Sequence, residues 1–290
     1  MATEMDDRGR LHFDQIVFSG GGTRCFWHGG FMEVVGPHLA RPAKRISAVS
    51  GGALSAAARI ADRESDLLSI MGERLEARQN NLSIGWDEFQ ENGLTPHQQL
   101  YSDVVDALLD DEALARIADG PSFQVLLSRP PHDKLPELST APMMAAYEAD
   151  LVLRSTPHVV FPNMLGAEEE LVDARQAARD GNLQKLICSA AVIPPVFNVE
   201  GWEGRPVVDG GMANKAPVPD PDEGETLILL TRKFRNLPEE PARYTYIEPS
   251  KATPADKIDF TDREKIEKTW QQGREDGQRF LDRCCSAAKD

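Results

Sequence analysis

Ile46-Ser47-Ala48-Val49-Ser50-Gly51-Gly52-Ala53-Leu54-Ser55 is the stretch around which this chain is organised, and it predicts a strand end, a sharp turn and a helix start. Ser50 stands at the turn, with the small residues Ala48 two positions before it and Gly52 two positions after it. A nucleophile elbow of the form G-x-S-x-G needs this pattern, because the strained turn leaves no room for larger side chains. Ala48 takes the place of the first glycine. The alternative is a Ser/Gly loop that only caps a helix, and the stretch alone does not decide between the two.

The composition is that of a globular protein with an acidic surface. The 290 residues are 41% hydrophobic and 27% charged, and the formal net charge is −15. Nucleic acids bind basic clusters, so we expect no nucleic-acid partner, and an acidic surface also disfavours steady attachment to an anionic membrane. No run of about 18 apolar residues predicts a membrane span, and the polar residues 1–10 do not resemble a secretory leader. We therefore expect a cytoplasmic protein whose membrane contact is peripheral, and either local and apolar or assisted by another factor.

The potential metal ligands are scattered. The four cysteines, Cys25, Cys188, Cys284 and Cys285, lack the spacing of a metal site or of a disulfide framework. We expect reduced thiols, no metal and no cofactor. The acidic run 168–170 is expected in a loop or at a helix start, and without further ligands nearby it does not predict a metal site.

A glycine-rich loop, Gly20-Gly21-Gly22-Thr23-Arg24, lies between a predicted strand and a predicted helix. Such a loop presents backbone N–H groups to an anion. A phosphate loop would end in Gly-Lys-Ser/Thr, and a dinucleotide fingerprint would have glycine at Cys25 and an acidic residue about twenty positions further on; neither pattern is present. We interpret the loop as an oxyanion hole, in which the amides of Gly21 and Gly22 and the charge of Arg24 face a developing alkoxide. The alternative for Arg24 is a surface arginine in a solvated loop.

The rest of the chain predicts strands and helices in a single domain over residues 1–290. Strands are expected over residues 12–19, before the elbow, and over 123–128, 158–161 and 226–231, the last a continuous apolar run typical of a buried parallel strand. Helices are expected after the elbow to residue 62 and over 63–80, 97–118, 140–154 and 179–190. A packed loop with Trp86 and Phe89 is expected over residues 80–96.

The C-terminal segment predicts a long helix with one closely packed face. Thr261-Asp262-Arg263-Glu264 has the pattern of a capping box. The residues that then fall on one helical face are Ile266, Trp270, Gly273, Gly277 and Leu281. The apolar, proline-stiffened segment 189–197 lines an acyl pocket or packs in the core, and the sequence leaves both open.

The histidines decide which base a serine nucleophile can use. None of the six lies after residue 158. In the α/β-hydrolase triad the histidine follows the acid in the sequence, so this triad is impossible with Asp209 as the acid. Asp209 follows two β-branched residues and precedes Gly210-Gly211, which predicts a carboxylate held at a strand end; the alternative is an Asp-Gly hairpin turn. Either Ser50 is not a nucleophile, or Asp209 accepts its proton directly and the oxyanion hole stabilises more of the transition state.

Three motifs in order, the glycine-rich loop 20–24, the elbow 48–52 and Asp209-Gly210-Gly211, resemble the pattern of the patatin-like phospholipase family. That pattern is a glycine-rich oxyanion loop ending in x-Arg/Lys-Gly, a G-x-S-x-G elbow and a D-G-G/A triplet. Segment 189–197 is similar to the family's S-x-x-x-P-x-x-F loop. The resemblance covers residues 13 to about 217 through these motifs, which are modest singly and more specific together.

The resemblance implies an α/β, three-layer patatin-like fold, with a mainly parallel central sheet and helices on both faces. It implies that Ser50 is the nucleophile and Asp209 the base, and that Gly20, Gly21, Gly22 and Arg24 form the oxyanion loop. The implied activity is phospholipase A-type hydrolysis of acyl esters, without metal. The implied partners are a phospholipid or other lipid ester as substrate and a transient membrane-surface contact; an activator of unknown kind is compatible with so acidic a protein acting on a membrane.

Two departures from the family pattern support a different class of function. Ala48 replaces the first elbow glycine, and Cys25 replaces the glycine after Arg24, where it would narrow the oxyanion loop. The alternative is therefore a catalytically silent protein that binds lipids or acyl chains on the same scaffold. A third hypothesis is a nucleotide-binding module that uses the glycine-rich loop. Cys25 is either a structural residue or a redox-sensitive thiol.

Overall fold

The computed structural model describes residues 10–80, 94–130, 145, 149, 153, 155–158, 166–194, 197–239, 241–257 and 262–287. The loop predicted around Trp86 and Phe89 lies outside these ranges. The helix predicted over 140–154 and the strand predicted over 158–161 have only isolated residues within them.

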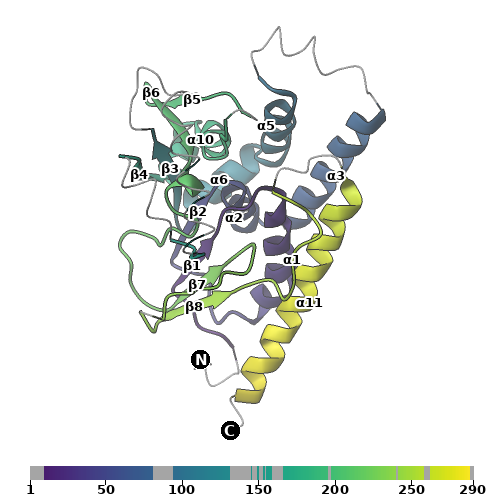
Figure 1. Ribbon diagram of the computed structural model, residues 1–290, viewed down its shortest axis with the longest axis vertical. Helices are drawn as coiled ribbons and strands as arrows, with labels where there is room; N and C mark the ends of the chain where they lie inside the picture. The colour runs from purple at the N-terminus through teal and green to yellow at the C-terminus, as the bar shows by residue number, and fades with distance from the viewer. Residues whose placement is uncertain are drawn as a thin grey trace.

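A mixed but mainly parallel sheet forms the centre of the fold (Figure 1). Its described strands are β1 (Gln15–Phe18), β2 (Arg45–Val49), β3 (Ser122–Arg129), β4 (Glu168–Asp173), β5 (Glu200–Trp202), β6 (Arg205–Asp209), β7 (Thr226–Leu229) and β8 (Tyr244–Ile247). They follow the order β5-β6-β3-β2-β1-β7-β8, and β4 pairs with β3. Strands β3, β2, β1, β7 and β8 are parallel, whereas β4 and β6 run antiparallel to β3. The predicted α/β class with a central sheet and helices is confirmed.

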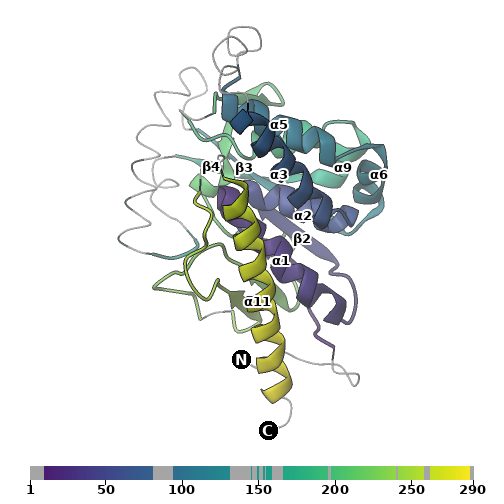
Figure 2. The same ribbon diagram turned by 90° about the vertical axis from the view of Figure 1, so that its right-hand side faces the viewer.

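The sequence predicted helices on both faces of this sheet, whereas the described helices cover one face (Figure 2). They are α1 (Phe26–Val35), α2 (Gly51–Ala61), α3 (Glu64–Asn80), α5 (Pro96–Leu108), α6 (Asp111–Asp119), α9 (Ala174–Arg179), α10 (Leu183–Ser189) and α11 (Arg263–Ala287). Successive side chains of a strand point to opposite faces. Ile16 and Phe18 accordingly join the main core with the helices, while Val17 packs on the other face with Ile228 and Tyr246.

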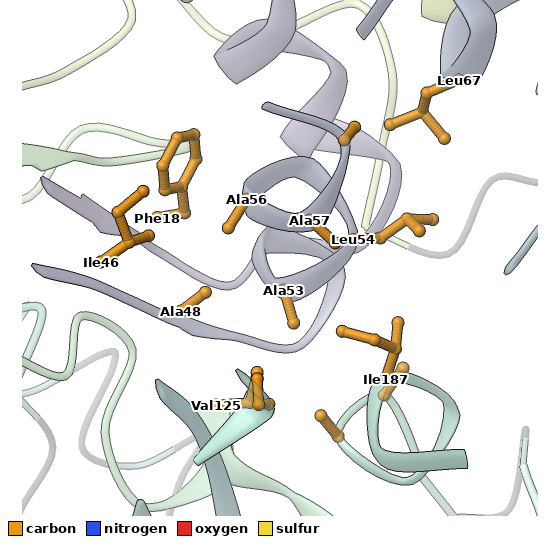
Figure 3. Close-up of a cluster of buried hydrophobic side chains, with 14 of the residues drawn as sticks. Phe18, Ile46, Ala48, Ala53, Leu54, Ala56, Ala57, Leu67, Val125 and Ile187 are labelled. Carbon is orange, nitrogen blue, oxygen red and sulfur yellow. The ribbon is translucent and has the colours of Figure 1, made fainter. Parts of the chain in front are cut away.

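Small side chains let α2 pack closely on the strands that precede it. Ala53, Ala56 and Ala57 of α2 are fully buried. Figure 3 shows Ala56 on the side of Phe18 and Ala53 on the side of Ala48 of the sheet. Because these alanines carry only a methyl group, α2 lies closer to the sheet than larger side chains would allow. This short distance determines where the first turn of α2 lies.

The long helix α11 lies along α1, as the glycines of its predicted buried face suggest (Figure 1). A Cβ atom on Gly273 would lie 2.3 Å from the carbonyl oxygen of Trp27, and one on Gly30 would lie 1.9 Å from that of Trp270. The two backbones are therefore nearly in contact. The indole N–H of Trp270 donates to Glu33 (2.7 Å), which also accepts from Arg274 (2.8 Å).

Several predicted elements differ in detail from the observed ones. The helix predicted over 97–118 is broken between α5 and α6, because Asp110 caps α6 by accepting from the amide of Ala113 (2.9 Å). The helix predicted over 179–190 is instead α9 and α10, separated at Gly181, whose φ is +69°.

Two predictions, the location of the acidic run 168–170 and the capping residue of the C-terminal helix, were wrong. The run 168–170 lies in strand β4, not in a loop or at a helix start; it pairs antiparallel with β3 at a position that exposes charge, as edge strands often do. Asp262 caps α11 by accepting from the amide of Glu264 (2.9 Å), so the cap is one residue later than Thr261, which lies outside the described ranges.

Candidate active site

The strand register places Ser50 and Asp209 side by side. Strand β3 pairs with β4 along one edge and with β2 along the other. The pairing with β2 ends where Val49 of β2 lies beside Leu126 of β3. Strand β6 takes over the same edge at the next position, where Leu127 pairs with Asp209. The end of β2 and the end of β6 therefore meet at one point of the sheet, although they are far apart in the sequence.

The turn at Ser50 is strained, as the elbow pattern predicts. Ser50 has φ 55° and ψ −140°, a backbone conformation that residues other than glycine rarely adopt. The chain also passes close to its neighbours at Gly52, where a Cβ atom would lie 2.5 Å from the carbonyl oxygens of both Phe18 and Ser19. Ala48 lies in β2, fully buried and paired with Phe18, so the methyl group that departs from the family pattern is accommodated in the core.

The side chains of Ser50 and Asp209 are joined by a short hydrogen bond. Ser50 Oγ donates to Asp209 Oδ2 at 2.6 Å, and the amide of Gly211 donates to Asp209 Oδ1 at 2.7 Å. Ser50 is 4% exposed and Asp209 is 3% exposed. The amide of Asp209 also donates to the carbonyl oxygen of Val192 (2.8 Å), which fixes its backbone. The carboxylate is thus held with one oxygen on the serine hydroxyl and the other on a backbone amide.

Burial raises the pKa of Asp209 above its ordinary value. The positive charge of Lys257, the hydrogen bonds from Ser50 and Gly211, and the charge of Lys215 act in the opposite direction. A carboxylate with a raised pKa is a stronger base than one in water. The environment therefore favours proton transfer from Ser50 to Asp209 more than an exposed aspartate would.

The glycine-rich loop lies against the elbow, but its members have different roles. The amide of Gly20 donates to the carbonyl oxygen of Lys215 (3.0 Å), so it is not available to a substrate. Gly22 has φ +58°, and a Cβ atom there would lie 1.7 Å from the carbonyl oxygen of Lys257. Within the described residues, no hydrogen bond is recorded from the amides of Gly21 and Gly22. These two amides are the ones that we interpreted as oxyanion donors.

Arg24 points to a different partner from the one expected. Its guanidinium forms an ion pair with Asp256, in the segment that follows β8, and Arg24 does not line the cavity beside Ser50. The hydroxyl of Thr23 donates to the backbone carbonyl of Asp256, and the amide of Thr23 donates to that of Lys257 (3.4 Å). The arginine therefore helps to hold segment 256–257 on the glycine-rich loop.

An apolar cavity opens beside Ser50, with an empty volume of about 600 Å³ that includes solvent at its mouth. Its lining is Gly22, Thr23, Cys25, Phe26, Ser50, Gly51, Leu54, Ser55, Leu67, Met71, Tyr101, Ala191, Ile193, Phe197 and Lys257. Ile193 and Phe197 come from the proline-stiffened segment, so this segment contributes to the cavity wall. Apolar walls that lead to the buried hydroxyl of Ser50 suit an acyl chain with an ester at its end.

Sequence reasoning missed two polar residues of this cavity. Lys257 supplies the one charged side chain among the described lining residues, and Tyr101 supplies a hydroxyl from α5. Tyr101 lies in the helix predicted over 97–118, which has no motif. Lys257 lies in a polar segment without any motif. Neither position carries a local signal, because both reach the cavity through tertiary packing.

The cavity wall also contains Cys25. Its Sγ donates to the carbonyl oxygen of Ser19 at 3.6 Å, and burial raises the pKa of the thiol well above its usual range. A protonated, buried thiol is a poor nucleophile, which favours a structural role for Cys25 over a redox-sensitive one.

The described residues lack two further features. No group of three or more His, Cys, Asp or Glu side chains could hold a metal ion in the part of the chain that the structure describes. Among the described helices, none is long and apolar enough to cross a membrane.

Comparisons with known proteins bear on the same residues. The model of the family described as patatin-like phospholipase matches residues 16–222, which is more than half of the chain and includes Ser50 and Asp209. Among curated proteins, none matches the sequence. Among solved structures, VipD from Legionella pneumophila matches with a TM-score of 0.49 and 11% sequence identity, over 96% of this chain and 69% of that one.

Proposed function

Because this chain belongs to the patatin-like phospholipase family, we propose that it is a lipid acyl hydrolase of the phospholipase A type that works through a Ser50–Asp209 dyad. The observation that carries the proposal is the 2.6 Å hydrogen bond from Ser50 to a buried carboxylate, at the end of an apolar cavity. The substrate is a phospholipid or another lipid ester, reached by transient contact with a membrane surface.

The acylation step that we propose uses the hydrogen bond between Ser50 and Asp209. Ser50 Oγ attacks the carbonyl carbon of the ester while its proton passes to Asp209 Oδ2, and the carbonyl oxygen becomes an alkoxide. The amides of Gly21 and Gly22 donate to this oxyanion, each worth about 3–4 kcal/mol if it is well aligned. When the intermediate collapses, the bond to the leaving alcohol breaks, and protonated Asp209 returns the proton to the leaving oxygen.

Deacylation repeats the same steps with water. Asp209 accepts a proton from a water molecule as that water attacks the acyl group on Ser50. The bond between Ser50 Oγ and the acyl carbon then breaks, and the serine recovers its proton from Asp209. The products are a free fatty acid and a regenerated serine, so no redox partner is needed.

Release of fatty acid from mixed phospholipid vesicles tests the proposal. Wild type is compared with Ser50→Ala and Asp209→Asn, and with Ser69→Ala as a matched control on the exposed surface of α3. We expect activity in the wild type and in the control, and none above background in the dyad variants, with circular dichroism unchanged. Activity that survives Ser50→Ala would refute the dyad.

The second candidate is a silent lipid-binding protein, favoured by the position of Cys25 on the cavity wall beside Ser50. Labelling with an alkyl fluorophosphonate separates the two candidates, because it requires a reactive serine but no natural substrate. A label on Ser50 in the folded protein supports the hydrolase. Lipid binding without any label on Ser50 supports the silent protein.

A further inference from the structure

One polar group in the cavity is not explained by the dyad. Four lining residues carry hydroxyl groups, namely Thr23, Ser50, Ser55 and Tyr101. The hydroxyls of the first three donate to Asp256, to Asp209 and to the carbonyl oxygens of Cys25 and Gly51, respectively. The hydroxyl of Tyr101 is buried and has no hydrogen-bond partner in the described part of the chain.

An unpartnered buried hydroxyl is costly, so the position of Tyr101 calls for an explanation. The residue is 5% exposed, and its ring packs against Phe197 with 6.1 Å between centroids. A hydroxyl taken out of water without a partner loses a hydrogen bond that the unfolded chain would make with solvent. Phenylalanine would fill the same space without this loss. A ligand that enters the cavity with a hydrogen-bond acceptor removes the deficit.

The hydroxyl of Tyr101 remains a donor at all physiological pH values. Burial raises its pKa well above the ordinary value, and the nearby groups Cys188, Cys25 and Asp209 act in the same direction. The phenol therefore presents a proton, and what it lacks is an acceptor.

We propose that Tyr101 is a substrate-binding residue that donates a hydrogen bond to the acyl carbonyl oxygen of the bound ester, an inference that rests on the proposed function. The carbonyl oxygen is the stronger acceptor of the two ester oxygens. Its carbon must lie against Ser50 Oγ for attack, and Ser50 and Tyr101 line one cavity. Tyr101 reaches this cavity from α5, whereas Gly21 and Gly22 belong to the loop after β1, so the carbonyl is held between two separate elements.

The first measurement is the binding of methyl nonyl ketone by isothermal titration calorimetry, since a ketone has the acyl carbonyl but no cleavable bond. Wild type is compared with Tyr101→Phe and with the matched control Tyr246→Phe. The hydroxyl of Tyr246 lies 3.1 Å from His158 Nε2, outside the cavity lining, so it has a partner already. We expect Tyr101→Phe to weaken ketone binding about 2- to 10-fold, the usual value of one hydrogen bond, and Tyr246→Phe to leave it unchanged.

Thermal unfolding without ligand gives the second measurement, and only the Tyr246 variant should lose stability. Tyr101→Phe removes an unpartnered hydroxyl and should leave Tm unchanged or raise it. Tyr246→Phe removes a paired hydroxyl and should lower Tm. A structural role for the Tyr101 hydroxyl would instead lower Tm without affecting ketone binding.

The proposal is overturned if the wild type does not bind the ketone, if Tyr101→Phe binds it as tightly as the wild type, or if Tyr101→Phe lowers Tm as Tyr246→Phe does. Ester turnover is measured in parallel, and Tyr101→Phe should lower kcat/KM while Ser50→Ala abolishes it. Weaker ketone binding by Tyr101→Phe, together with ester turnover that survives Ser50→Ala, would refute the proposed reaction and leave the role of Tyr101 standing.

Discussion

Backbone strain at Ser50 predicts that glycine at this position stabilises the protein more than alanine does. Ser50 has φ 55° and ψ −140°, next to the region that only glycine occupies readily. Its side chain makes no capping hydrogen bond to α2, so neither substitution removes a helix cap. Ser50→Ala and Ser50→Gly both remove the hydrogen bond to Asp209. The difference in stability between the two variants therefore isolates the backbone.

The sign of this difference depends on two opposing effects. A non-glycine residue held in such a conformation costs about 1–3 kcal/mol, which glycine releases. Glycine also gives the unfolded chain more freedom, which lowers stability by about 0.4–1 kcal/mol relative to alanine. The strain is the larger effect, so we expect Ser50→Gly to be more stable than Ser50→Ala by about 0.5–2 kcal/mol.

Urea unfolding of the two variants measures the difference, and two further positions act as matched controls. Asp62 at the end of α2 has φ 58° and ψ 45°, so glycine should be favoured over alanine there too. Ser69 lies within α3, where alanine should be favoured over glycine by about 1 kcal/mol. If Ser50→Ala proves as stable as Ser50→Gly or more stable, while both controls behave as expected, the elbow is not strained and the reasoning fails.

Three further predictions concern pH and packing. Activity requires ionised Asp209, whose pKa is raised by burial, so the acid limb of the pH–rate profile should lie above pH 3.8. Because the charge of Lys257 lowers this pKa, Lys257→Gln should move the acid limb to higher pH, whereas the exposed control Lys251→Gln should leave it in place. His28 is fully buried, and desolvation lowers its pKa to about 3, so the side chain stays neutral in the folded state. The free energy of unfolding should therefore fall by up to about 1.4 kcal/mol per pH unit as pH drops from 6.5 towards 3. In urea titrations at several pH values, His28→Phe should flatten this dependence. Gly30→Ala would place a Cβ atom 1.9 Å from the Trp270 carbonyl oxygen and should lower the free energy of unfolding by more than about 2 kcal/mol. Gly201→Ala, whose Cβ meets nothing nearer than 3.7 Å, should change stability little, and equal effects of the two variants in thermal unfolding would contradict the close contact of α1 and α11.

The parts of the site that sequence could predict are those specified by local backbone chemistry. A serine between Ala48 and Gly52 indicates a turn that only small residues permit, and the structure has that turn with Gly52 against Phe18 and Ser19. Asp209 before two glycines indicates a carboxylate at a strand end, and β6 ends there. In both cases a few neighbouring residues determine the conformation, so the pattern is readable without the fold.

The parts that sequence could not predict depend on contacts between distant segments. Arg24 and Asp256 are 232 positions apart, and no local pattern joins them. The ion pair is largely exposed at Asp256, so its contribution to stability is small. With Arg24 turned to Asp256, the cation in the cavity wall is Lys257, from a segment without a motif.

The two departures from the family pattern do not have equal weight once their surroundings are known. Ala48 is fully buried in β2, where its methyl group packs in the core away from the cavity lining (Figure 3). The position at which a methyl group cannot be accommodated is Gly52, and there the chain keeps glycine. Cys25 is different, because its side chain lines the cavity beside Ser50 and a Cβ atom on Gly51 would lie 3.2 Å from its Sγ. The case for a silent scaffold therefore rests on Cys25 alone. Tyr101 reaches the cavity from α5, whereas Cys25 belongs to the segment after β1, so the carbonyl position that we assign to Tyr101 is set by a different element from the one that carries Cys25.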